Sequence, residues 1–182
     1  TAHTATGTII ENDKIVEINV DPNGNGNPVV YEAGLPSGTD AAATSEQAIG
    51  ETFTISTTDG VSNVSVGGTS MTLAQLKAAS AGSPISINTG EGTITITGYS
   101  SADGDKSATV TYTYTLNAAQ THATANGNNT LIDSVPIVVN SGLTTEGSAT
   151  LNVTIVDDVP VAQSFTAYLT EAKTVIPSET DL

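Results

Sequence analysis

T-V-T-Y-T-Y-T-L, the stretch from Thr109 to Leu116, alternates polar and apolar residues without a break. Side chains of a β-strand point to opposite faces in turn, so this pattern predicts a strand with one buried and one exposed face. The β-branched threonines suit the exposed face of such a strand. The same alternation recurs on both sides of this stretch, in Thr52–Ser56, Val64–Val66, Thr93–Thr97, Val135–Val139 and Leu151–Ile155. A chain with this period almost throughout is predicted to be all-β.

Short turns separate the expected strands. They contain glycine and lie at Thr58–Gly60, Gly67–Gly68, Gly90–Gly92 and Asp103–Asp105. Roughly seven to nine short strands with such turns favour an antiparallel β-sandwich of immunoglobulin-like, Greek-key topology. A jelly roll is the structural alternative.

One segment departs from the period of two. In T-L-A-Q-L-K-A-A-S, Thr72–Ser80, the apolar residues Leu73, Leu76 and Ala79 fall on one face of a helix. Thr72 stands where an N-cap residue is expected. The segment therefore predicts one short helix. By contrast, residues 117–130 are small and polar, which predicts a long surface loop.

The composition limits the possible partners. The 182 residues include 4 basic and 19 acidic side chains, for a formal net charge of −15. Nucleic acids and anionic membrane surfaces are bound through Lys and Arg, so neither is an expected partner. So many carboxylates repel one another in a compact state, and a divalent cation is the expected counter-charge. The chain has no Cys and no apolar run long enough to span a membrane, so neither disulfides nor membrane insertion is expected.

The two ends of the sequence echo each other. T-A-T-G-T-I-I-E-N-D at Thr4–Asp13 is similar to S-A-T-L-N-V-T-I-V-D-D at Ser148–Asp158. E-A-G-L-P-S-G-T-D at Glu32–Asp40 is similar to E-A-K-T-V-I-P-S-E-T-D at Glu171–Asp181. An offset of about 140 residues has the size of a whole domain, which indicates one unit of a tandem array.

This echo divides the chain into three expected parts. Residues 1–27 are the end of a preceding repeat with its linker, 28–158 are the repeat domain, and 159–182 are the start of the following repeat. Proteins built in this way are usually long rods in which most units have a mechanical role.

Carboxylates gather where the expected strands end. Ca²⁺ takes six to eight oxygen ligands, several of them from carboxylates on irregular backbone. The adjacent Asp157 and Asp158 at the domain exit are the first candidate ligands, followed by Glu32 in the head of the repeat. Further candidates lie at the same junctions or in turns, namely Asp13, Asp40, Glu171, Asp103 and Asp105. The alternative is that these acids are solvated turn residues, which is the usual role of Asp in turns.

Other kinds of site find little support. His3 and His122 are far apart and no Cys accompanies them, so no transition-metal site is expected. No Ser stands in a nucleophile elbow, and nothing marks a pair of acids for glycoside hydrolysis. Tyr112 and Tyr114 share the apolar face of their strand, which predicts core packing rather than a sugar-binding shelf. The chain is therefore not expected to be an enzyme.

Four blocks, in order along the chain, resemble a known family. They are V-V-Y-E-A-G-L-P-S-G-T-D-A-A at Val29–Ala42, V-G-G-T-S-M-T-L-A-Q-L at Val66–Leu76, N-T-G-E-G-T-I-T-I-T-G-Y at Asn88–Tyr99 and I-V-D-D-V-P at Ile155–Pro160. Together they resemble the large repeat of giant RTX adhesins, which Gram-negative bacteria export by type I secretion and keep on the cell surface in biofilms.

The resemblance implies an Ig-like extender domain that stacks head to tail on neighbouring repeats of the same chain, with Ca²⁺ stiffening the junctions. It implies Glu32, Asp157 and Asp158 as ligands near those junctions. The sequence departs from the family at Asn140–Gly147, where an Asp-rich turn is often found and Glu146 is the only acid. No internal calcium site is expected in that turn.

The expected function is that of a calcium-stabilised structural extender repeat of a bacterial cell-surface adhesin. Such a unit is extracellular and monomeric, projects a distal binding region, and supports adhesion and biofilm formation. A host or biofilm-matrix ligand would be bound through other domains. The alternative is a calcium-dependent peptide- or glycan-binding module of the same kind of adhesin, which a calcium-lined cleft away from both termini would favour.

Overall fold

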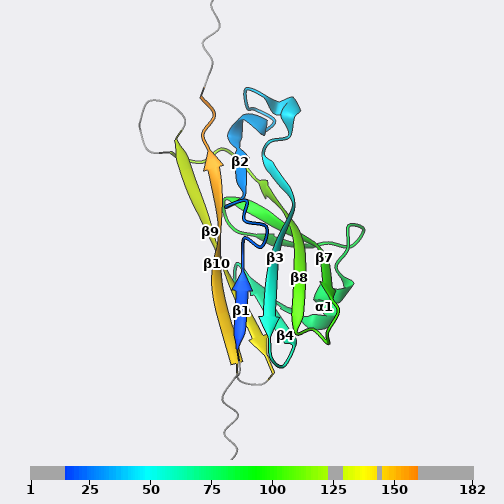
Figure 1. Cartoon of the computed structure of the whole chain (residues 1–182). Coiled ribbons are helices and arrows are strands. Elements are labelled where there is room, and N and C mark those ends of the chain that lie inside the picture. The colour runs from blue at the N-terminus through cyan, green and yellow to red at the C-terminus, as the bar shows by residue number, and fades with distance from the viewer. Residues whose placement is uncertain (1–14, 123–128, 143–144, 160–182) are drawn as a thin grey trace, which may run out of the picture.

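Two five-stranded β-sheets face each other in the computed structural model, which describes residues 15–122, 129–142 and 145–159 (Figure 1). The first sheet has the strand order β1-β3-β8-β7-β6 and the second has the order β2-β10-β9-β4-β5. The strands are β1 Val16–Asn19, β2 Val29–Tyr31, β3 Gln47–Thr57, β4 Val61–Val66, β5 Thr69–Thr72, β6 Ile85–Asn88, β7 Gly92–Ser101, β8 Ser107–Leu116, β9 Thr130–Ser141 and β10 Thr145–Val156. The helical elements are α1 Leu73–Ala78 and the 3-10 helices η1 Glu32–Gly34 and η2 Ala41–Ala43.

The strand order is that of an immunoglobulin-like Greek key. β1, β3, β8 and β7 follow the order of strands A, B, E and D of that fold, and β4, β9 and β10 follow the order of C, F and G in the facing sheet. All pairs are antiparallel except β2 with β10, which are parallel. The predicted all-β immunoglobulin-like sandwich is therefore confirmed. The described ranges hold ten strands rather than seven to nine, because β1, β2, β5 and β6 are too short to show a period.

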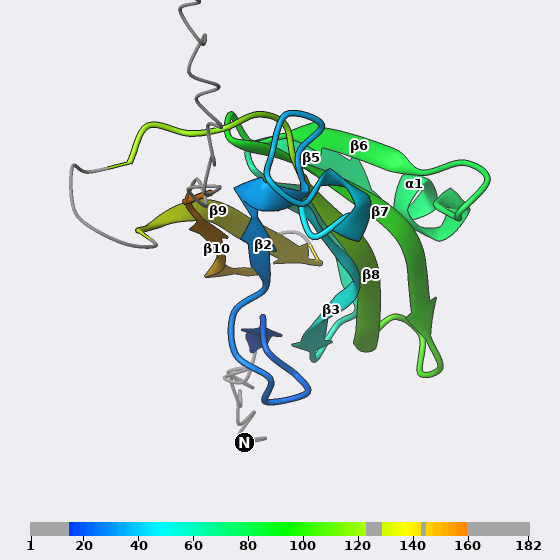
Figure 2. The same ribbon diagram turned by 90° about the horizontal axis from the view of Figure 1, so that it is seen from above.

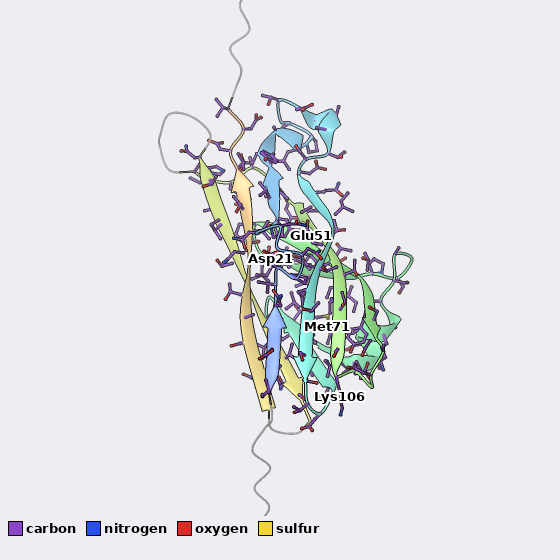
Figure 3. The ribbon with its side chains drawn as sticks, in the orientation of Figure 1. Asp21, Glu51, Met71 and Lys106 are labelled. Carbon is purple, nitrogen blue, oxygen red and sulfur yellow. The ribbon has the colours of Figure 1, made fainter. Side chains whose placement is uncertain are left out.

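The core lies between the sheets and is built by the alternating apolar side chains. Tyr112 and Tyr114 of β8 are both buried, so the prediction of core packing for them is confirmed. Phe53 of β3 packs on Tyr112 with ring centroids 6.1 Å apart in a tilted arrangement, which is within the range that aromatic pairs prefer. Met71 of β5, labelled in Figure 3, is also buried. Viewed from above, β9 and β10 lie on one side of this core and β3, β8 and β7 on the other (Figure 2).

The predicted helix is confirmed as α1. Its N-cap Thr72 accepts a hydrogen bond from the backbone N–H of Gln75 at 3.3 Å, and the Gln75 side chain accepts one from the Thr72 N–H at 2.9 Å. This reciprocal capping box satisfies two donors that a helix start would otherwise leave unpaired. Leu76 is fully buried where α1 packs against β4, β5 and β7.

The described chain enters at one end of the sandwich and leaves at the other (Figure 1). Val16 of β1 lies so close to Gly147, near the start of β10, that a Cβ on this glycine would overlap it. β10 then runs for 12 residues, about 40 Å at the usual rise of a strand, to the exit. Entry and exit are therefore separated by the long axis of the domain.

The N-terminal boundary differs from the expected start at residue 28. β1 pairs with β3, Val16 opposite Thr57, so this part of the expected linker belongs to the sandwich. Four residues are too few for their alternation to stand out from a linker. The loop between β1 and β2 is held by Asp21, whose carboxylate accepts hydrogen bonds from the N–H groups of Asn25 and Gly26 at 2.9 and 3.0 Å.

The buried tyrosines predict a loss of stability at alkaline pH. Burial raises the pKa of Tyr112, Tyr114 and Tyr99 well above the ordinary value of 10.0. An unfolded chain loses these protons near pH 10 while the folded chain keeps them, so the unfolded state binds fewer protons there. The contribution of these tyrosines to the free energy of unfolding is therefore fully present below about pH 10, and it is lost as the pH rises further.

Thermal unfolding at about pH 8 and about pH 11 checks this expectation, with a clearly lower Tm at the higher pH. Tyr112→Phe is the control, because the buried Tyr112 hydroxyl has no hydrogen-bond partner in the described ranges. This variant should unfold like the parent at pH 8 and lose less stability on going to pH 11. An unchanged Tm across the interval would contradict the prediction.

Candidate metal centre

Three segments meet at the exit end of the sandwich. β2 runs parallel to β10 with Tyr31 opposite Val156, so the residues that follow, Glu32 and Asp157, emerge side by side. The third segment is the loop 117–122 after β8. One turn of 3-10 helix starts at Glu32, and the N–H of Asp157 donates to the Asn129 carbonyl at 2.9 Å, which continues the pairing of β10 with β9.

Glu32 is a buried acid, with 4% of its surface exposed. Its Oε1 accepts a hydrogen bond from the Gln120 backbone N–H at 2.7 Å and lies 2.8 Å from His122 Nε2. A buried carboxylate is tolerated only when it is paired and hydrogen-bonded, and these two contacts supply both conditions. Glu32 therefore fastens the loop 117–122 to the start of η1.

His122 and Asp157 complete a three-residue group with Glu32. One ligand atom from each residue lies within 4.8 Å of the other two, and it is the one group of this kind in the described ranges. The His122 side chain is 6% exposed. Its Nδ1 is buried and has no hydrogen-bond partner among the residues that the structure describes. The group thus presents carboxylate oxygens from two acids and an imidazole nitrogen, which is a donor set for a metal ion.

The Asp158 side chain makes contacts that differ from those of its neighbour Asp157. Its carboxylate accepts hydrogen bonds from the Thr39 backbone N–H at 2.8 Å and from the Thr39 hydroxyl at 2.5 Å. Successive side chains of an extended segment leave on opposite sides. The structure therefore brings Glu32 and Asp157 together, as expected, and directs Asp158 to the loop before η2 instead.

The remaining predicted ligands do not join this group. Asp40 is exposed, and its backbone N–H donates to the Ala33 carbonyl at 2.9 Å. Asp13 and Glu171 lie outside the described residues.

Asp103 and Asp105 belong to the turn between β7 and β8. Asp105 forms an ion pair with Lys77 at 2.7 Å and accepts a hydrogen bond from the Tyr99 hydroxyl at 3.1 Å. Asp103 accepts from the Ser107 N–H at 2.7 Å, and hydrogen bonds from Ser107 lower the pKa of this carboxyl group. The Asp105 carboxylate is already paired with the Lys77 ammonium. Both acids are therefore better explained as residues of a hairpin turn than as ligands of a calcium-binding loop.

His122 is the residue that sequence reasoning missed. The segment 117–130 was expected to be a surface loop, yet the His122 side chain is buried and Thr130 already begins β9. The small polar residues around His122 gave no periodic signal. Glu32 precedes it by 90 positions, so no motif spacing could join the two.

A second buried acid lies outside the candidate centre. Asp133 of β9 is 5% exposed and accepts hydrogen bonds from the Tyr114 hydroxyl at 2.8 Å and the Thr89 hydroxyl at 2.6 Å. The Tyr114 donor comes from β8 of the facing sheet, and the Thr89 donor comes from the turn between β6 and β7. The arrangement ties the two sheets together, and no metal-binding partner accompanies it in the described ranges.

The donor chemistry of the exit end does not match Ca²⁺, the ion that the family resemblance implies. Ca²⁺ is a hard cation that takes oxygen ligands only, usually six to eight of them. The group at Glu32 offers two carboxylates together with an imidazole, and imidazole suits Zn, Cu, Fe or Ni. The carboxylate of Asp158 is already engaged by Thr39. The group at Glu32, as far as the described residues form it, is therefore not the oxygen-only donor set of a calcium site.

Comparisons with protein-family models, with curated proteins and with solved structures each find no match for this chain. Within the described ranges, no helix has the length and apolar character required to cross a membrane. The chemistry of the centre is therefore inferred from its own residues.

Proposed function

We propose that this chain is a structural extender unit of a bacterial cell-surface adhesin, and that a divalent cation at its exit end stiffens the connection to the segment that follows. The observation that carries this proposal is the path of the chain, which enters beside the start of β10 and leaves after its end. Units with that path add their lengths when they are joined in series. A long projection then follows from repetition alone.

The exit is held in a defined direction by the unit itself. The Asp157 N–H donates to the Asn129 carbonyl at 2.9 Å, and Asp158 accepts hydrogen bonds from Thr39, so both residues after β10 are bonded to the surrounding chain. These ties favour a stiff departure of the chain from the sandwich. The formal charge of −15 adds a reason for a cation at a junction between units, because like charges on adjacent units repel.

The binding-module alternative finds less support. The group with metal-ligand geometry lies at the exit rather than in a cleft away from both ends. A groove elsewhere on the described surface is lined by parts of β1, β3 and β8 with Ser148 of β10, and Glu17 is the single acid in its lining. That groove does not reach Glu32, His122 or Asp157. A calcium-dependent peptide or glycan site in it would lack the carboxylates that hold the ion.

Small-angle X-ray scattering on a tandem protein tests the extender proposal. Two copies are joined at the echo, with residue 158 of the first followed by residue 14 of the second. The maximum dimension should be about twice that of the single unit when metal is present, because the path through each unit is about 40 Å long. With EDTA the distribution of distances should broaden, since the carboxylates at the junction then repel one another.

The matched variant carries Asp157→Ala and Asp158→Ala in the first copy. It should keep both domains folded by circular dichroism and show the broadened distribution even with metal present. Two units that pack side by side, with a maximum dimension close to that of one unit, would contradict the extender proposal. A tandem protein that is equally extended in EDTA would support the extender proposal and would contradict the stiffening role of the cation.

A further inference from the structure

We infer that Glu32, His122 and Asp157 form a binding site for a borderline transition-metal ion, with Zn²⁺ as the first candidate, and not for Ca²⁺. The inference rests on the exit-end cation of the proposed function and names its chemical class. It does not depend on where the unit is found or on what the distal end of a rod would bind.

The distances between the donors suit a small ion. Two ligands of one tetrahedral Zn²⁺, each about 2.0–2.2 Å from the metal, lie roughly 3.3–3.6 Å from each other. Glu32 Oε1 and His122 Nε2 are 2.8 Å apart, and the ligand atoms of all three residues lie within 4.8 Å of one another. Small rotations of the side chains therefore bring three donors to one point. The backbone can keep its position, because the parallel pairing of β2 with β10 already places two of the three ligands side by side.

The imidazole is the independent observation that separates this group from an ordinary acidic cluster. His122 is nine-tenths buried, yet its Nδ1 has no partner among the described residues. Nε2 is the nitrogen that faces Glu32, so a metal ion in the group binds there, and Nδ1 then carries the proton of the neutral imidazole. His is also the commonest metal ligand, and it binds borderline metals rather than hard cations.

The contacts around the group resemble those that orient metal ligands. Glu32 Oε1 accepts the Gln120 N–H at 2.7 Å, so this carboxylate is held in position by the backbone. Outer contacts of that kind fix the orientation of a ligand and raise metal affinity. Three protein ligands leave a fourth position of a tetrahedral ion open. Water or a donor from a following unit can take it, and in the second case the metal joins one unit to the next.

Titration calorimetry of the full chain with ZnCl₂, after removal of metal with EDTA and dialysis, tests the inference. One Zn²⁺ should bind per chain, at least about tenfold more tightly than Ca²⁺ from CaCl₂ in a parallel titration. His122→Ala should weaken Zn²⁺ binding by at least about tenfold. His3→Ala is the matched control, because His3 is the other of the two histidines in the sequence, and its Zn²⁺ affinity should equal that of the parent.

A second readout needs no variant of the centre. On addition of ZnCl₂, the imidazole C–H signals of one histidine should shift in the proton NMR spectrum, and the same signals should shift in His3→Ala. This measurement remains decisive if His122→Ala fails to fold. An absence of Zn²⁺ binding, an unchanged affinity in His122→Ala, or Zn²⁺ shifts confined to His3 would each overturn the inference.

The calcium titration separates this inference from the proposed function. If Ca²⁺ binds more tightly than Zn²⁺ and Asp157→Asn abolishes its binding while His122→Ala does not, the metal class is wrong. The scattering result can still show an extended tandem protein in that case. Conversely, a compact tandem protein that binds Zn²⁺ through His122 would contradict the extender proposal and leave the metal site intact.

Discussion

Tyr114→Ala is expected to lower the free energy of unfolding by about 4–6 kcal/mol. The Tyr114 ring, from the last part of β8, is fully buried, and removing a ring of this size leaves a cavity that the two sheets cannot close. The change also removes one of the two hydroxyl donors to the buried carboxylate of Asp133. Gly92 stands against the same ring, at a place where a Cβ would overlap it, so the neighbouring backbone has no side chain with which to fill the space.

Urea unfolding monitored by circular dichroism measures this loss. Tyr114→Phe is the matched control, because it keeps the ring and removes only the hydroxyl donor. It should cost about 1–2 kcal/mol, since Asp133 retains its hydrogen bond from Thr89. If the two variants were equally stable, the cavity would contribute little, which would contradict a closely packed core around Tyr114.

Glu32→Ala is expected to cost about 2–4 kcal/mol in metal-free buffer. The change leaves the Gln120 N–H without its acceptor and removes the partner of His122 Nε2, and both groups are held inside the exit end. Buried donors that lose their partner carry the full cost of desolvation. The loop 117–122 should loosen as a result, and its amide protons should exchange faster by hydrogen-exchange mass spectrometry.

The control for this prediction is Glu32→Gln, which keeps an acceptor oxygen for the Gln120 N–H at nearly the same shape. It should lose no more than about half as much stability as Glu32→Ala. Glu51 of β3, labelled in Figure 3, provides a comparison outside the centre, and Glu51→Ala should leave exchange in the loop 117–122 unchanged. Normal exchange in Glu32→Ala would show that Glu32 does not fasten this loop.

Local patterns along the chain were sufficient to predict much of the fold. The alternation in Thr109–Leu116 gave the strand β8 and the burial of Tyr112 and Tyr114, because one face of a strand repeats every second residue. Thr72 as an N-cap, followed by Leu73 and Leu76 on one helical face, gave the start of α1, because both signals involve residues only a few positions apart. Each of these features depends on neighbours in sequence, so the residues themselves carry the signal.

The first two ligands of the candidate centre were also accessible from the sequence. Glu32 and Asp157 stand just beyond residues that the structure pairs in the parallel strands β2 and β10. Their acidic character at expected strand ends was enough to single them out. Asp157 and Asp158 were expected to act together, but the direction in which each side chain leaves the backbone decides its neighbours, and Asp158 accepts hydrogen bonds from Thr39.

The sequence by itself determined the all-β class, the buried face of the long strands, the helix α1 and the excess of acidic side chains. Only the tertiary structure decided that His122 joins Glu32 across 90 residues, and that the exit end offers an imidazole where oxygen ligands alone were expected. The physical reason is that strand periodicity and helix capping are local, whereas the register of β2 against β10 and the path of the loop 117–122 are set by how the two sheets pack.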